Sequence, residues 1–86
     1  MAEDSEIITR FQKNSQEEIR FCIANFKGRE YVDIRIFYSK DGDFLPSKKG
    51  ITVALDTWSD FRHSIEKLET TLRERELISS AQEGTP

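Results

Sequence analysis

The chain has little of what marks a membrane, secreted or disulfide-bonded protein. Its single cysteine, Cys22, excludes an intrachain disulfide and fits a reducing compartment. No run approaches the ~20 apolar residues of a membrane span. The acidic residues 1–6 lack the basic and then apolar character of a signal peptide. We therefore expect an intracellular protein with no membrane partner, in the cytoplasm or nucleoid of a bacterium or in the nucleus of a eukaryote.

Residues suited to catalysis or to a cofactor are also scarce. His63 falls beside the apolar positions of a charged helix, with no serine or cysteine partner indicated. Cys22 falls mid-strand among bulky neighbours, where it is more typical of packing than of nucleophilic chemistry. Asp41-Gly42-Asp43 lacks the remaining ligands of a calcium loop. We expect no catalytic residue, no metal site and no cofactor, and the protein is predicted not to be an enzyme.

The length allows one domain, predicted to span residues 1–86 with a core at about 7–76, a frayed acidic N-terminus and a polar C-terminal tail. A chain of this size buries only about 60% of its unfolded surface, so self-association is the expected source of further stability. The net charge is −3, but residues 18–53 carry seven cations against five anions, a net +2 between acidic flanks. Local potential decides binding, so an anionic partner is compatible with this chain.

Alternation with a period of two runs from residue 19 to 38 and indicates paired strands. If Lys27-Gly28 is a two-residue hairpin turn, residues whose numbers sum to 55 face each other. One face then collects Phe21 opposite Ile34, Ile23 opposite Val32, and Ile19 opposite Ile36. The other collects Phe26 opposite Arg29, Ala24 opposite Tyr31, Cys22 opposite Asp33, and Arg20 opposite Arg35. Opposed arginines need an anion nearby, and Asp33 and an external phosphate are the two candidates.

The rest of the pattern predicts short strands around Ile7–Phe11, Asp43–Leu45 and Ile51–Leu55, with turns at Asp41-Gly42 and Pro46–Gly50. The period then changes to 3.6, which predicts a helix from about residue 56 to 76, capped by Asp56 or Thr57. Its narrow apolar stripe is either packed on its own sheet or, as we favour, shared with a second copy in a dimer. The stripe, and hence the predicted dimer interface, comprises Trp58, Phe61, Ile65, Leu68 and Leu72.

Cations interleaved with aromatic rings on strands are typical of a nucleic-acid-binding surface, since cations meet phosphates and rings stack on bases. The same residues also fit an ordinary solvated charged face with a few covering rings. Taken singly, Lys27, Lys40 and Lys48-Lys49 are unremarkable surface lysines. A second class of function also stays open, a protein-interaction module that uses the sheet or helix surface and binds nucleic acid incidentally.

Phe26 to Arg35, the aromatic pair Phe37-Tyr38, Asp41-Gly42 and Pro46 to Thr52 together resemble the transcriptional coactivator family known as positive cofactor 4. The resemblance covers roughly residues 19–68. It implies an α+β fold, a curved four-stranded antiparallel sheet followed by one C-terminal helix, in a homodimer that binds single-stranded DNA or melted duplex. RNA and the transcription machinery are further candidate partners. The family's nucleic-acid-binding positions match Phe26, Lys27, Arg29, Arg35, Tyr38, Lys48 and Lys49.

Four departures from the family pattern are visible, and one is that the helix begins Ala54-Leu55-Asp56-Thr57 and not with the family's polar cap followed by Pro. Tyr38 stands where eukaryotic members often have Trp, and Ser47 replaces a usual Gly. The long Ser/Lys-rich tail of the larger eukaryotic members is missing, which suggests a compact microbial member. Strict alternation also places Tyr38 on the opposite face from Arg35, so both reach one ligand only if the strand bulges or ends between them.

Overall fold

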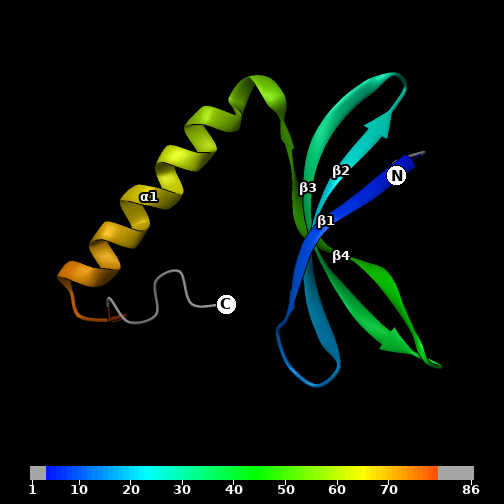
Figure 1. The fold of residues 1–86 in the computed structure, drawn as a ribbon, viewed down its shortest axis with the longest axis horizontal. Coiled ribbons are helices and arrows are strands. Elements are labelled where there is room, and N and C mark those ends of the chain that lie inside the picture. The colour runs from blue at the N-terminus through cyan, green and yellow to red at the C-terminus, as the bar shows by residue number, and fades with distance from the viewer. Residues whose placement is uncertain (1–3, 80–86) are drawn as a thin grey trace. The chain divides into compact units, whose positions relative to one another are not determined.

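The computed structural model describes residues 4–79, which divide into two compact units between Asp56 and Thr57. The first is one antiparallel sheet in the order β1-β2-β3-β4, and the second contains a single helix (Figure 1). The elements are β1 (Asp4–Gln12), β2 (Glu17–Phe26), β3 (Arg29–Lys40), β4 (Asp43–Ala54), a 3-10 turn (Leu55–Thr57) and α1 (Trp58–Glu74). The predicted α+β fold is confirmed, and the homodimer stays a prediction.

The β2–β3 hairpin has the predicted register, from Phe26 opposite Arg29 to Arg20 opposite Arg35. Its turn is Lys27-Gly28, with φ of 54° and 80°. Positive φ at both central residues gives a turn whose twist matches that of the flanking strands. The β3–β4 turn, Asp41-Gly42, repeats this geometry with φ of 53° and 85°. These two turns lie at opposite ends of the meander (Figure 1).

The two predicted strands after Asp41-Gly42 are in fact one. Pro46–Gly50 was expected to be a turn, but it lies inside β4, where Pro46 pairs with Phe37 and Gly50 pairs with Arg35. The register between those pairs is irregular, because residues 47–49 of β4 stand opposite Ile36 alone. Extra residues on one strand make a bulge rather than a chain reversal. The turn-like composition of this segment therefore reflects a bulge.

The first strand is longer than predicted and begins at Asp4, three residues before the expected start of the core at residue 7. Its pairing with β2 shifts between Ile7 and Thr9, so a bulge interrupts the apolar alternation there. Residues 1–3 and 80–86, where frayed ends were expected, lie outside the described residues.

We call the side of the sheet that carries Phe26, Arg29, Arg35 and Arg20 the basic face, and the side that carries the isoleucines the apolar face. The most buried side chains are Cys22, Ala24, Val53 and Glu18. By register, all but Val53 belong to the basic face. The basic face is thus the inner side of a curled sheet, where small residues fit. It is more enclosed than the open solvated surface considered from the sequence.

Helix α1 begins two residues later and ends two residues earlier than the predicted range of 56–76. Thr57 occupies the N-cap position, but its side chain makes no capping hydrogen bond there. The predicted apolar stripe is present and much of it is uncovered in the single chain, with Ile65 49% and Leu68 55% exposed. No helix among residues 4–79 is both long and apolar enough to cross a membrane.

Candidate nucleic-acid interface

Phe26, Lys27 and Arg29 form one cluster of candidate residues, at the β2–β3 turn. Phe26 ends β2 and faces Arg29 at the start of β3, while Lys27 occupies the turn. The Lys27 Nζ lies 5.3 Å from the centre of the Phe26 ring, and Phe26 is 37% exposed. A cation over one side of a ring leaves the other side for a flat group. The cluster therefore offers a stacking surface with a positive charge beside it.

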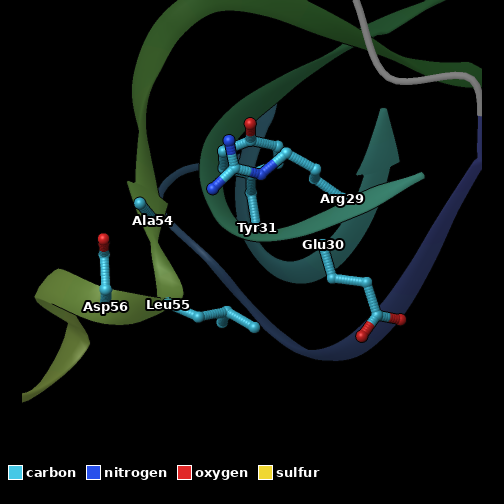
Figure 2. A pocket seen from close by; sticks show the side chains of 6 residues that line it. All are labelled: Arg29, Glu30, Tyr31, Ala54, Leu55 and Asp56. Carbon is cyan, nitrogen blue, oxygen red and sulfur yellow. The ribbon is translucent and has the colours of Figure 1, made fainter. Parts of the chain in front are cut away.

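A hollow of about 280 Å³ opens beside this cluster. Figure 2 shows Arg29 and Tyr31 on the inner side of the curled β3, with Glu30 pointing the other way. This follows from the alternation of a strand. The guanidinium of Arg29 can bind an anionic group, and the phenol ring of Tyr31 can contact a flat ring attached to that group. The lining residues are Arg29, Glu30, Tyr31, Ala54, Leu55 and Asp56.

The second cluster consists of Arg35, which follows Arg29 by six residues on β3, and the lysine pair Lys48-Lys49 on the neighbouring β4. Arg35 donates to both oxygens of Asp33, at 2.9 and 3.2 Å, and to the main-chain carbonyl of Ser47, at 3.0 Å. The hydrogen bond to Asp33 raises the pKa of Arg35 above its ordinary value. Asp33 is therefore the internal anion for Arg35, and the Ser47 carbonyl holds this side chain toward β4.

Ser47 fixes the bulge that carries the two lysines. Its Oγ donates to the carbonyl of Ile36 at 2.7 Å and accepts from the amide of Lys49 at 3.0 Å. Lys48 and Lys49 are exposed on this bulge. The sequence pointed to Ser47 only as a departure from a family pattern. The structure makes it the residue that ties the basic bulge to β3.

Tyr38 is not brought together with Arg35. β3 pairs with β2 without a break from Arg29 to Tyr38, so the strand does not bulge between these two side chains. The irregular register belongs to β4 instead. Tyr38 lies on the apolar face opposite Leu45, and its role in binding stays a prediction. The first cluster, at the β2–β3 turn, and the second cluster, around Arg35, do not share an end of the sheet. Six residues of β3, roughly 20 Å, separate Arg29 from Arg35.

Sequence reasoning left one feature of the basic face unexplained, the environment of Arg20. Its guanidinium carbon lies 4.3 Å from the centre of the Phe37 ring and 5.6 Å from that of Phe44, and its Nε donates to Glu18. The strand register places both Phe37 and Phe44 on the basic face. Among residues 4–79, no group of three or more His, Cys, Asp or Glu side chains is placed to hold a metal ion.

A sequence profile described as Transcriptional Coactivator p15 (PC4) matches residues 13–64. The chain is 38% identical over 69 residues to the RNA polymerase II transcriptional coactivator KIWI of Arabidopsis thaliana, which covers 80% of this chain and 61% of the relative. It is 39% identical over 57 residues to the coactivator KELP of the same plant, which covers 66% and 34%. The aligned part thus spans between about one third and three fifths of these relatives.

Solved structures with a similar fold include a PC4 homolog from Burkholderia pseudomallei. Its TM-score is 0.72 at 26% identity, and the match covers 80% of this chain and 95% of the other. A bacteriophage T5 homolog of the eukaryotic transcription coactivator PC4, implicated in recombination-dependent DNA replication, has a TM-score of 0.62 at 23% identity. That match covers 92% of this chain and 86% of the phage chain, and at this identity it concerns the fold alone.

Proposed function

The chain belongs to the Transcriptional Coactivator p15 (PC4) family, and on that premise we propose that it binds single-stranded DNA through the basic face and acts in transcription as a non-catalytic coactivator. The observation that carries this proposal is the pairing of an exposed ring with cations at the β2–β3 turn, where Phe26 lies under the Lys27 ammonium group and opposite Arg29. Rings accept unstacked bases, and cations beside them accept the linking phosphates.

The position of Arg35 and the lysine bulge supports the same proposal. Arg35 shares the basic face with Phe26 and Arg29, and the bulge that carries Lys48-Lys49 is hydrogen bonded to the same part of β3. A strand that follows this face would meet cations at both ends of a path of roughly 20 Å. Since these contacts reach phosphates and the faces of bases, we expect little preference for sequence.

A homodimer is part of the proposal. The stripe on α1 that includes Trp58, Ile65 and Leu68 is exposed in the single chain. Apolar surface of this kind on a small protein marks a contact with another protein. A second copy is the occupant favoured by the coiled-coil-like spacing of the stripe. The alternative, a module whose helix binds a different protein, predicts a monomer in isolation.

Titration of a fluorescent single strand, and of a duplex of the same length, tests the proposed ligand. The single strand should bind more tightly, because bases in an intact duplex are stacked on each other and not available to Phe26. Phe26→Ala should weaken single-strand binding about tenfold or more, since one stacked base contributes ~1–3 kcal/mol. Phe11→Ala is the matched control, because Phe11 is also an exposed ring but lies on the apolar face.

Equal affinity for the perfect duplex and the single strand would contradict the proposal. Equal losses in Phe26→Ala and Phe11→Ala would place the site elsewhere. An RNA of the same length, included as a third ligand, shows whether the 2′-hydroxyl matters to this face.

A further inference from the structure

Three arginines from three neighbouring strands lie in one row on the basic face. Arg10 of β1 is the register partner of Arg20 of β2, which is the partner of Arg35 of β3. The row continues to Gly50 of β4, beside Lys49. Neighbouring strands lie about 4.8 Å apart, so the row spans roughly 10 Å from Arg10 to Arg35, at right angles to the strands. Like charges placed side by side are unfavourable unless anions lie between them.

One carboxylate balances the part of the row furthest from the bulge. The Oε2 of Glu18 accepts a hydrogen bond from Arg20 and lies 3.8 Å from the Nη1 of Arg10. Of the charged side chains whose exposure the structure describes, Glu18 alone is buried, at 8% exposed. Arg10 is the open member of the group, with 59% of its side chain exposed. A buried anion is thus shared by two cations, of which Arg10 is largely exposed and Arg20 is largely buried.

Arg20 is held in place for a further acceptor. The rings of Phe37 and Phe44 lie against its guanidinium plane, and Glu18 takes the Nε donor. Within residues 4–79, these contacts use none of the N–H groups on its two terminal nitrogens. A guanidinium stacked on a ring keeps its edge donors in a fixed plane, the geometry that recognises a phosphate with two hydrogen bonds.

We propose that Arg10 and Arg20 form a phosphate-binding subsite on the β1–β2 side of the sheet, and that Glu18 is its resident counter-anion. This inference rests on the proposed binding of single-stranded DNA. It extends the path of the DNA from Lys48-Lys49 and Arg35 to β1 at the edge of the sheet. Glu18 balances the row when no ligand is bound, and it competes with the phosphate of the ligand.

The competition has a measurable signature. In the wild-type protein Glu18 already neutralises Arg10 and Arg20, so no salt anion has to leave these arginines when a phosphate arrives, and only the cations condensed on the nucleic acid are released. In Glu18→Gln, anions from solution would take that place and be released on binding. Affinity for a single strand should therefore rise several-fold at low salt, and the slope of log affinity against log salt should become steeper. A carboxylate with only a structural role would lower stability and raise neither quantity.

Arg10→Gln tests the subsite by removing one of its two cations, and Arg10 is exposed, so the change removes no buried group. It should lower the magnitude of the salt slope by ~0.7, the value for one phosphate contact on a single strand, and the affinity about fivefold at 0.1 M salt. Lys13→Gln is the control, since it removes a cation that pairs with Glu17 in the neighbouring β1–β2 loop, outside the row. Its slope should stay at the wild-type value.

Three results would overturn the inference: an Arg10→Gln slope equal to that of wild type, equal losses in Arg10→Gln and Lys13→Gln, or a folded Glu18→Gln protein whose affinity and slope do not rise. If Glu18→Gln does not fold by circular dichroism, the comparison of Arg10→Gln with Lys13→Gln decides alone. Failure of the proposed function is a separate outcome, because the wild-type protein would then show no preference for a single strand over a duplex.

Discussion

Gly50→Ala should weaken the sheet at the point where the arginine row meets the lysine bulge. A Cβ built on Gly50 would lie 2.5 Å from the carbonyl oxygen of Ile34, 2.9 Å from the Cα of Arg35 and 3.1 Å from its Cβ. Ordinary contacts of a Cβ are 3.4–4 Å. The nearest neighbours belong to the backbone of β3 and cannot rotate away, so β3 and β4 must separate to admit one methyl group.

Overpacking of this kind costs about 1–3 kcal/mol. With an m-value of about 1 kcal/mol per molar urea for a small domain, the unfolding midpoint should fall by ~1–3 M. Urea titration followed by circular dichroism, at one fixed protein concentration, measures the change. A larger side chain at Gly50 should cost more, so Gly50→Asn should be less stable than Gly50→Ala.

Gly28 provides the matched control. Nothing lies within 4 Å of a Cβ placed there, but its φ is +80°. The cost at Gly28 therefore follows backbone preference, and Asn, which tolerates this conformation, should be less damaging than Ala. The two sites should thus rank Asn and Ala in opposite orders. The same order at both sites, or a Gly50→Ala protein within ~0.5 kcal/mol of wild type, would refute the close-approach argument.

Three further outcomes are expected. Leu68→Asp should convert the dimer to monomer in sedimentation equilibrium, because it places an unpaired charge in the apolar contact; a wild-type protein that is monomeric at micromolar concentration would end the dimer proposal. Burial raises the pKa of the Cys22 thiol, so as pH rises the unfolded state loses the thiol proton before the folded state does. The free energy of unfolding should therefore fall as pH rises above ~8.5, and Cys22→Ser should not show this fall. Replacing Lys48 and Lys49 with Ala should lower affinity for every sequence alike and flatten the salt slope by ~0.7 per lost contact; an unchanged slope would make the bulge an ordinary solvated one.

The β2–β3 hairpin could be predicted residue by residue because three local signals agree on it. Lys27-Gly28 sets the turn, the alternation sets the faces, and a shift of one residue would move every isoleucine to the other face. The helix was predicted for a similar reason, since its apolar positions keep one period. It begins two residues later than predicted because the chain enters α1 through a 3-10 turn without a capping side chain, and it ends two residues earlier, just before Glu76 takes a left-handed φ of 58°.

The parts that could not be predicted are those where a bulge changes the period. In β4 the bulge at residues 47–49 has the composition of a turn, and only pairing with β3 shows that the strand continues. In β1 the shift after Ile7 breaks the alternation, so Arg10 could not be assigned to a face. The shared role of Glu18 was hidden for the same reason, because it depends on β1 lying beside β2. Bulges are set by hydrogen bonding between strands, which one strand's sequence does not display.

The turn at Lys27 implies a conflict between durability and activity. Lys27 and Asp41 have nearly the same left-handed backbone, with φ of 54° and 53°, each followed by a glycine. Asp tolerates that conformation, and Lys does so less well. An engineer who seeks a more heat-resistant protein would place Asn at position 27, and under the proposed function would thereby discard the ammonium group that accompanies Phe26. Selection for thermostability alone should repeatedly yield changes at this position that bind nucleic acid poorly.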